Sequence, residues 1–323
     1  FSSGLGMSPK KRENNQKKKV ALIGCGLIGQ SWAISFLSAG FEVSLFDPVE
    51  GVTVQSQEKI IVKLSDLQNY GLLKNKNISD FLDKIHLARD ISQAVEGSFY
   101  VQESGPEDLD IKRELTKKID AATPDNIPIA SSTSGIPASM YASEVKGKYR
   151  CLVAHPINPP HLIPAVEIVP APFTSKAITQ VVKKIITSID KEPLELKKEI
   201  PGFVVNRLQG ALLSEAFKLV KDGIASVEDI DKAISEGLGL RWSFMGPFHT
   251  IHLNAPEGIA GYVKRYEKMY GEMFNKSDIG WSSVVKLGLE EELLKLYHLS
   301  EREKHEKERD TKLTELILHK TKI

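Results

Sequence analysis

The chain has 323 residues, a length that allows two domains with separate hydrophobic cores. Its 43 basic and 42 acidic residues give a formal net charge of +1, so no overall field favours nucleic acid or an anionic membrane as a partner. The two cysteines, Cys25 and Cys151, are far apart and predict neither a disulfide framework nor a zinc site, which favours a reducing, cytoplasmic location.

Residues 1–18 form a basic and polar run without the apolar core of a secretory signal, and we expect a disordered tail there. We expect the residues ahead of Met7 to be an artificial addition to the natural chain. The apolar stretch at residues 27–41 is interrupted by Gln30, Ser31, Ser35 and Ser38 and is too short to cross a bilayer, so we expect no membrane span.

Residues 19–199 have the pattern of an α/β domain. A short apolar run at residues 20–23 predicts a strand, residues 27–39 predict a helix, and residues 42–46 predict a second strand. Further strand-like segments alternate with helical ones, at residues 127–130 and 151–154. This alternation predicts a Rossmann-type doubly wound sheet.

Residues 200–323 predict an all-α domain that binds substrate and forms a homodimer. A helical pattern at residues 203–220 begins this domain, and Ser226 with Asp229 three residues later predicts an acidic capping box for the next helix. Residues 290–312 are rich in lysine and glutamate and predict a long surface helix with solvated charges. The apolar faces of the helices are the basis for expecting the dimer.

A pattern typical of dinucleotide-binding loops, GxGxxG, lies between the first predicted strand and helix, at Gly24, Gly26, Leu27, Ile28 and Gly29. Gly24 permits the tight turn, Gly26 lets a pyrophosphate approach the backbone, and Gly29 allows close helix packing. Asp47 ends the second strand, where its carboxylate can accept hydrogen bonds from a ribose and repel a 2′-phosphate. The pattern therefore predicts NAD, and not NADP, as the cofactor.

Four polar residues in the middle of the chain stand in distinctive contexts: Ser134 in Ser-Ser-Thr-Ser-Gly, His155 in Ala-His-Pro-Ile-Asn-Pro-Pro, Glu167 in Val-Glu-Ile-Val and Asn206 in Phe-Val-Val-Asn-Arg. In this order and context they resemble the 3-hydroxyacyl-CoA dehydrogenase family. The segments Glu-Gly-Leu-Gly-Leu-Arg-Trp and His-Leu-Asn-Ala resemble its lambda-crystallin branch, the L-gulonate 3-dehydrogenases. The resemblance extends from residue 19 to the region of residue 270.

Oxidation of a secondary alcohol requires a proton acceptor near the hydroxyl, and a neutral imidazole is a side chain that titrates near working pH. His155 is therefore the candidate base. The resemblance gives Glu167 the role of fixing the tautomer of His155 and stabilising its imidazolium. Ser134 and Asn206 can hydrogen-bond the substrate oxygen as it becomes a carbonyl, so we expect them to bind substrate as well. These four residues form the predicted catalytic set.

The resemblance also implies contacts near the nicotinamide end of the cofactor, from Glu107, Lys112 and Asn158. Arg241 corresponds in the resemblance to an arginine of the crystallin and carnitine branches. A guanidinium can hold a free carboxylate through two hydrogen bonds, and a thioester lacks that group, so Arg241 favours a small free hydroxy acid as substrate.

The resemblance of the His-Leu-Asn-Ala segment to the lambda-crystallin branch favours L-gulonate as the substrate. The product would be 3-dehydro-L-gulonate. L-Carnitine and a 3-hydroxyacyl-CoA thioester are the alternative substrates. A structural, lens-type crystallin without physiological catalysis is the alternative of another class. His249 and His252 have the spacing of a metal-binding pair, but no third ligand lies at useful spacing, so we expect no metal site.

Overall fold

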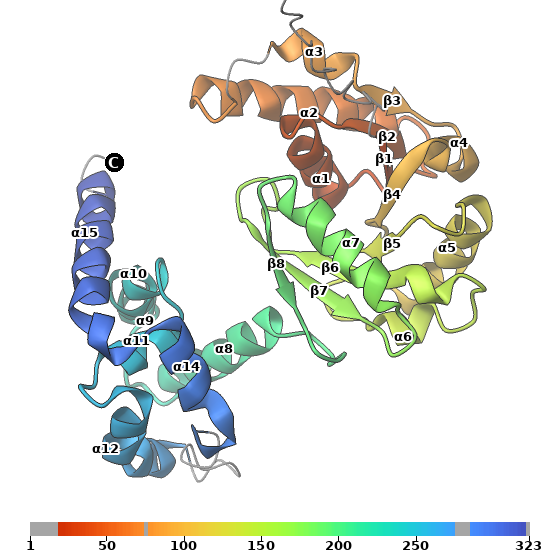
Figure 1. Cartoon of the computed structure of the whole chain (residues 1–323). Helices are drawn as coiled ribbons and strands as arrows, with labels where there is room; N and C mark the ends of the chain where they lie inside the picture. Colours follow the sequence, from red (N-terminus) through yellow and green to blue (C-terminus); the bar gives the residue numbers. More distant parts are fainter. Residues whose placement is uncertain (1–18, 74–76, 275–284, 321–323) are drawn as a thin grey trace, which may run out of the picture. The chain divides into compact units, whose positions relative to one another are not determined.

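The computed structural model describes residues 19–73, 77–274 and 285–320, and the predicted tail at residues 1–18 lies outside them. The chain divides into two compact units, Phe1–Ala211 and Leu212–Ile323. The first contains all the strands of the described chain, and the second is helical (Figure 1).

The strands of the first unit that fall in the described ranges form one eight-stranded sheet with the order β3-β2-β1-β4-β5-β6-β7-β8. Their bounds are β1 Lys19–Ile23, β2 Glu42–Phe46, β3 Ile85–Leu87, β4 Ser98–Glu103, β5 Ile129–Ser131, β6 Cys151–Pro156, β7 Ala165–Pro170 and β8 Glu192–Glu195. The strands from β1 to β6 pair in parallel, whereas β7 pairs antiparallel with β6 and parallel with β8. Strands are added on both sides of β1, as in a doubly wound sheet, which confirms the predicted Rossmann-type fold.

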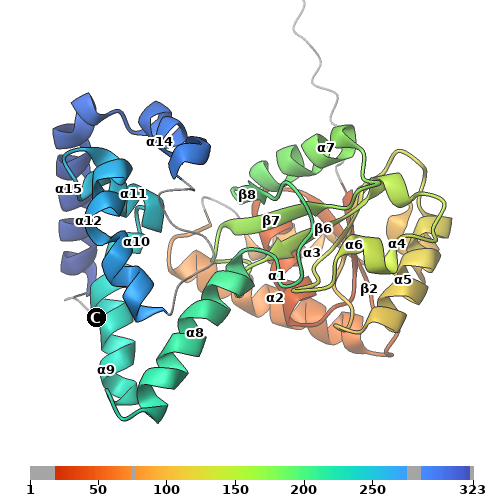
Figure 2. The same cartoon turned by 90° about the horizontal axis from the view of Figure 1, so that it is seen from below.

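Helices cover both faces of this sheet, with α1, α2 and α7 on one face and α4, α5 and α6 on the other (Figures 1 and 2). The helices of the unit are α1 Leu27–Ser38, α2 Val52–Asn69, α3 Ile78–Leu82, α4 Ile91–Val95, α5 Leu109–Ala122, α6 Ala138–Tyr141, α7 Lys176–Thr187 and the start of α8 Val205–Lys221, with a 3-10 turn at Lys148–Arg150. Crossover helices on both faces leave the sheet buried, and its carboxyl edge is where such folds bind ligands.

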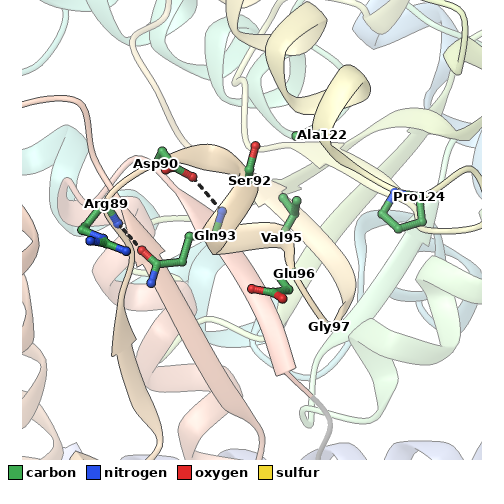
Figure 3. Close-up of a pocket in the computed structure, with 9 residues that line it drawn as sticks. All are labelled: Arg89, Asp90, Ser92, Gln93, Val95, Glu96, Gly97, Ala122 and Pro124. Carbon is green, nitrogen blue, oxygen red and sulfur yellow. Dashed lines mark hydrogen bonds between the residues drawn. The ribbon is translucent and has the colours of Figure 1, made fainter.

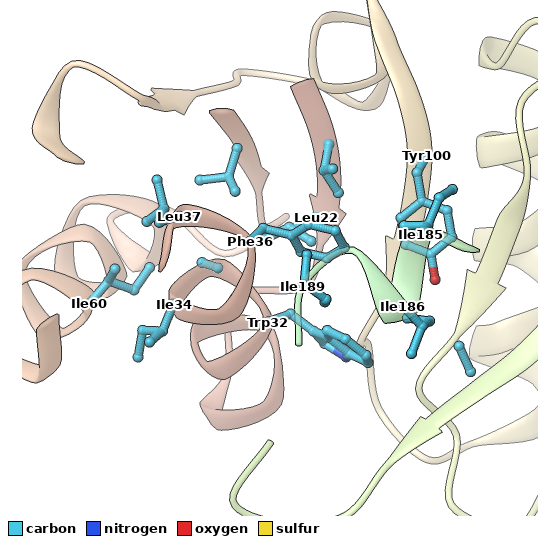
Figure 4. Packing of buried hydrophobic residues seen from close by; sticks show 14 of the residues in the cluster. Leu22, Trp32, Ile34, Phe36, Leu37, Ile60, Tyr100, Ile185, Ile186 and Ile189 are labelled. Carbon is cyan, nitrogen blue, oxygen red and sulfur yellow. The ribbon is translucent and has the colours of Figure 1, made fainter. Parts of the chain in front are cut away.

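Each face of the sheet has its own hydrophobic core, because successive residues of a strand point to opposite sides. Val20 and Leu22 of β1 join the cluster under α1, α2 and α7, whereas Ala21 and Ile23 join the cluster under α4, α5 and α6. Figure 4 shows the first cluster, in which Trp32 of α1 lies among aliphatic side chains. Burial of one large apolar side chain contributes about 1.5–3 kcal/mol, so these clusters hold the carboxyl edge of β1 and β4 in place.

The second unit begins within α8 and has a small core of Ile259, Val263 and Leu293. Its helices are α9 Val227–Lys232, α10 Gly239–Trp242, α11 Pro247–Leu253, α12 Gly258–Met273, α14 Glu290–Leu296 and α15 Arg302–Lys320, with π-helical segments at Ala233–Leu238 and Val285–Leu289 and a 3-10 turn at Leu299–Glu301. This helical unit confirms the predicted all-α C-terminal part. Over the described ranges, none of the helices combines the length and the apolar character that crossing a membrane demands.

The long surface helix predicted for residues 290–312 is wrong, because the chain leaves the helical path at Tyr297 (φ −141°, ψ 73°) between α14 and α15. The ring of Tyr297 stacks on His249 with 3.5 Å between ring centroids. His298 then accepts a hydrogen bond from the Ser300 N–H at the start of the 3-10 turn. The stacking contact of Tyr297 with His249 therefore separates α14 from α15, although the charge pattern of residues 290–312 would allow one continuous helix.

Candidate active site

The glycine loop between β1 and α1 has the shape that a dinucleotide requires. A Cβ at Gly24, where φ is +95°, would lie 2.6 Å from the carbonyl oxygen of Ser104, and one at Gly29 would overlap the carbonyl oxygen of Gly24. At Gly26, by contrast, a Cβ would meet no atom of the described chain within 4 Å. Packing thus requires the outer two glycines, and Gly26 keeps open the space where a pyrophosphate lies in such loops.

Leu27 and Ile28 form the first turn of α1. The N–H groups of a first helical turn have no acceptor within the helix, so these two amides can bind an anion, and the helix dipole favours negative charge there. The side chain of Leu27 is 71% exposed, whereas Ile28 packs against the core. The backbone of this pair, and not its side chains, is therefore suited to a phosphate.

Asp47 follows β2 and anchors itself to the glycine loop. One carboxylate oxygen accepts the Cys25 N–H at 2.9 Å and the other accepts the Val49 N–H at 3.0 Å. Burial, and then the charge of Asp47, raises the pKa of the Cys25 thiol to about 12, so the thiol stays neutral. Cys25 is a packing residue beside a fixed negative charge.

A cleft of about 1380 Å³ opens beside this loop, lined by Gly24, Gly26, Asp47, Ser104 and apolar residues that include Ile91. A smaller hollow of about 600 Å³ lies next to it, lined by the residues labelled in Figure 3. The hollow shares Asp90, Ser92 and Ala122 with the cleft, so it continues the rim of the cleft. The glycines, the carboxylate and the cleft together fit a dinucleotide.

His155 and Glu167 form a hydrogen-bonded pair across β6 and β7. The antiparallel register places them directly opposite each other, and Nδ1 of His155 lies 2.7 Å from Oε2 of Glu167. Glu167 is fully buried, and its other oxygen accepts the N–H groups of Val204 and Val205 at 2.8 and 3.0 Å, at the start of α8. Phe203 packs against the imidazole with 5.7 Å between ring centroids.

Burial alone would raise the pKa of the Glu167 carboxyl, but its hydrogen bonds to His155 and to the Val205 and Val204 amides, together with the charge of His155, lower the pKa below its ordinary value. Glu167 is therefore ionised at neutral pH. A carboxylate only accepts, so Nδ1 of His155 carries the hydrogen that joins the two residues. The lone pair of the neutral imidazole is then on Nε2, which is the atom free to act as a base.

Ser134 and Asn206 meet at one hydrogen bond, from Nδ2 of Asn206 to the Ser134 carbonyl oxygen at 2.7 Å. Oε1 of Glu107 accepts the Ser134 N–H at 3.0 Å, the Ser134 hydroxyl at 3.2 Å and the Gly135 N–H at 3.1 Å. Thr133 donates to the same oxygen at 2.6 Å. Glu107 thus organises the serine loop at residues 133–135, a role that the sequence did not indicate, and its contact with the cofactor stays a prediction.

Lys112 lies inside the protein, 1% exposed, with its ammonium 3.0 Å from Oε2 of Glu103. It also donates to the Gly105 carbonyl oxygen at 3.4 Å, and the Gly105 N–H and the Ser131 hydroxyl both donate to Glu103. The ion pair supports the loop that follows β4. The contact of Lys112 with NAD stays a prediction, and Glu103 is a residue of this site that sequence reasoning missed.

Asn158 is exposed in the turn between β6 and β7. Arg241 lies in α10 of the second unit. Burial, and then a hydrogen bond with Tyr270, raises the pKa of the Tyr262 phenol to about 12, and the charge of Arg241 opposes this rise. His252 is buried and bonded to the Tyr297 carbonyl oxygen and the Ile259 N–H, and His249 stacks on Tyr297. Among the residues described, no group of three metal-binding side chains includes this histidine pair, which serves packing.

Two protein-family models match this chain. The model of the 3-hydroxyacyl-CoA dehydrogenase NAD-binding domain matches residues 19–200, and the model of the C-terminal domain of the same enzymes matches residues 202–312. The human lambda-crystallin homolog is 41% identical over 251 residues, which cover 77% of this chain and 78% of that protein.

The L-carnitine dehydrogenase of Streptomyces griseus is 39% identical over 241 residues, which cover 75% of this chain and 71% of that protein. Among solved structures, the 3-hydroxyacyl-CoA dehydrogenase of Archaeoglobus fulgidus superposes with a TM-score of 0.70 at 27% identity, covering 94% of this chain and 98% of that one. Both similarities extend well beyond the glycine loop.

Proposed function

Because the chain belongs to the 3-hydroxyacyl-CoA dehydrogenase family, we propose that it oxidises the 3-hydroxyl of a small hydroxy acid with NAD as its cofactor, and that the substrate is L-gulonate. The product is then 3-dehydro-L-gulonate. The observation that carries the proposal is the pairing of His155 with the buried carboxylate of Glu167 at 2.7 Å, an arrangement that makes a positioned base.

In the proposed mechanism, Nε2 of His155 takes the proton of the substrate hydroxyl. The buried carboxylate of Glu167 holds the tautomer that exposes Nε2 and stabilises the positive charge of the imidazolium. The two backbone amides at the start of α8 keep this carboxylate in place while the charge of His155 changes. Bound NAD would supply the acceptor for the hydride of the carbon that bears the hydroxyl.

Asn206 and Ser134 are proposed to hold the substrate oxygen. Asn206 uses one amide hydrogen on the Ser134 carbonyl, so its second N–H can donate to that oxygen as it becomes a carbonyl. The Ser134 hydroxyl can exchange its 3.2 Å contact with Glu107 for the substrate. The carboxylate of Glu107 would keep the serine loop in shape during that exchange.

NAD would be held by the glycine loop and the Leu27 and Ile28 amides at the pyrophosphate, and by Asp47 at the adenosine ribose. Glu107, Lys112 and Asn158 are proposed to act near the nicotinamide end. Arg241 is proposed to pair with the free carboxylate of the substrate. We also propose a cytoplasmic homodimer.

A substrate panel tests the proposal. Purified protein with NAD is given L-gulonate, L-carnitine or 3-hydroxybutyryl-CoA, and NADH formation is followed by absorbance. We expect the highest kcat/KM with L-gulonate. A higher kcat/KM with L-carnitine or with the thioester would replace L-gulonate as the proposed substrate and leave the proposed chemistry unchanged. The 39% identity to an L-carnitine dehydrogenase supports carnitine as an alternative. No NADH with any β-hydroxy acid would support a purely structural role.

A further inference from the structure

A hydrogen-bond chain beneath the carboxyl edge of the sheet runs from two buried side chains through two half-buried serines to the NAD cleft. Its centre is the Ser132 hydroxyl, which receives hydrogen bonds from Nε1 of Trp32 at 3.0 Å and from Nε2 of Gln102 at 2.7 Å. The third neighbour of this hydroxyl is Oγ of Ser104, at 2.8 Å. Trp32 and Gln102 are completely buried, so their N–H groups require these acceptors.

The orientation of the Gln102 amide is fixed by its other contacts. The atom that faces Ser132 also lies 3.3 Å from the carbonyl oxygen of Ala154, which can only accept, so this atom is the amide nitrogen. The opposite atom is the amide oxygen, and it accepts the hydroxyl hydrogen of Tyr100. One N–H of Gln102 thus goes to Ala154 and the other to Ser132.

The direction of the Ser132–Ser104 hydrogen bond follows from counting donors. A serine hydroxyl has two lone pairs and one hydrogen. Trp32 and Gln102 occupy both lone pairs of Ser132, so its single hydrogen goes to Oγ of Ser104. Ser104 therefore accepts from Ser132 and keeps its own hydrogen, for which the described part of the chain offers no acceptor.

Ser104 lies where a bound dinucleotide would pass. It follows β4 at the point where β4 neighbours β1, its N–H donates to the Ile23 carbonyl oxygen at 2.7 Å, and it lines the cleft. Its Cβ is 3.8 Å from the position that a Cβ on Gly29 would take, so its side chain abuts the glycine loop. The unused hydrogen of Ser104 is thus beside the region that such loops offer to a pyrophosphate.

We infer that Ser104 is a hydrogen-bond donor to the pyrophosphate of NAD, and that the Trp32–Gln102–Ser132 chain orients its hydroxyl for this task. The hydrogen bond from Ser132 occupies one lone pair of the Ser104 hydroxyl and so restricts its rotation before NAD arrives, and less rotational freedom is lost on binding. The inference depends on NAD binding and not on which hydroxy acid is oxidised.

Calorimetric titration of the Ser104→Ala variant tests this inference without any hydroxy acid present. We expect the Kd of NAD and of ADP-ribose, which both contain the pyrophosphate, to rise about three- to tenfold, since one hydrogen bond contributes that much. The Kd of adenosine, which lacks phosphate, should stay unchanged. Binding measured without substrate keeps this result separate from the outcome of the substrate panel.

Three results would overturn the inference. Unchanged affinity for NAD would show that the hydroxyl makes no contact with the cofactor. Equal weakening of NAD and adenosine would indicate a distorted cleft, and weakening of NAD alone, with ADP-ribose unaffected, would place the contact on the nicotinamide half. Ser92→Ala, which removes another hydroxyl from the lining of the same cleft, is the matched control and should leave the ratio of ADP-ribose to adenosine affinity unchanged.

The orienting role of Ser132 has its own measurement. Ser132→Ala leaves the N–H groups of Trp32 and Gln102 without their acceptor, so we expect a lower Tm together with weaker NAD binding. Ser132→Thr retains the hydroxyl and should restore NAD affinity. Loss of affinity in both variants to the same extent would show that the hydroxyl of Ser132 does not orient Ser104.

Discussion

His155 and Glu167 are direct cross-strand partners in β6 and β7, the one antiparallel pair among the described strands. The register of two strands, and not the conformation of a loop, therefore sets the 2.7 Å contact between imidazole and carboxylate. A catalytic pair on rigid strands is positioned more precisely than one on loops. The same carboxylate also binds the start of α8, so the helix that carries Asn206 is tied to the base.

Replacement of His155 by alanine should abolish turnover and leave NAD binding nearly intact, because the glycine loop and Asp47 hold the dinucleotide elsewhere. Loss of general-base assistance lowers kcat by roughly 10²- to 10⁴-fold. Steady-state kinetics and NAD titration measure the two effects separately. His86→Ala, at an exposed position of the edge strand β3, is the matched control, and near-normal turnover of the His155 variant would contradict the proposed base.

Glu167 predicts a pH dependence of stability. A carboxyl whose pKa is lower in the folded than in the unfolded chain stabilises the folded state above the unfolded pKa, and this contribution is lost as pH falls through the folded pKa. The pKa of Glu167 is lowered from 4.5, so we expect the wild-type Tm to exceed that of Glu167→Gln at pH 6 and the difference to shrink below pH 4.5. A difference that does not vary with pH would argue against an ionised Glu167. Glu195→Gln, at a partly exposed ion pair with Lys183, is the control and should change the Tm little.

Asp47 predicts the choice between NAD and NADP. Its carboxylate would face the 2′-phosphate of NADP with like charge, so wild-type protein should bind NAD more tightly. Asp47→Asn removes the charge and keeps the size of the side chain, although its single amide oxygen can accept only one of the two N–H groups, from Cys25 or from Val49. This variant should reduce the NAD preference by roughly tenfold or more. Titration with both cofactors measures the ratio of dissociation constants. Equal affinities in the wild-type protein would remove Asp47 from this role.

The parts of the site that could be predicted from the sequence are those built from neighbouring residues. The first strand, the glycine loop, the helix and the second strand with Asp47 after it form one local unit. The structure reproduces this unit almost residue for residue, with β2 at Glu42–Phe46. Local patterns suffice there because turn geometry demands glycine and burial demands apolar strands. The same holds for the Ser226 cap of α9, which accepts the Asp229 N–H.

The parts that could not be predicted depend on residues that are distant in the sequence. Glu103 is an ordinary strand-end glutamate until folding brings Lys112 and Ser131 to it, and Ser104 gains its donor direction from Trp32 and Gln102. The break at Tyr297 likewise depends on a ring 48 positions earlier in the chain. The partners that folding brings together and the direction of their hydrogen bonds are properties of the folded chain, and no local pattern of the sequence encodes them.

The proposed homodimer predicts an effect of substitution on α8. No described residue of this helix is buried, and within the second unit Leu213, Phe217 and Val220 are exposed apolar side chains, with Phe217 72% exposed. We expect wild-type protein to sediment with twice the chain mass and Phe217→Asp to shift it toward monomer. Val181→Asp on α7, also an exposed apolar position, is the control. A wild-type monomer at micromolar concentration would contradict the dimer.

Arg241 provides the test that bears most directly on the class of substrate. Pairing of its guanidinium with a free carboxylate would be similar in the ground and transition states, so Arg241→Ala should mainly raise KM, with kcat little changed. A hydrogen bond to a charged group contributes about 1.5–3 kcal/mol, so KM for L-gulonate should rise roughly ten- to a hundredfold. Arg265→Ala, which removes a surface guanidinium paired with Glu257, should leave KM unchanged. If KM for the best substrate were the same in the Arg241 variant, recognition of a free carboxylate would have to come from another residue, and a thioester would regain its place as a candidate substrate.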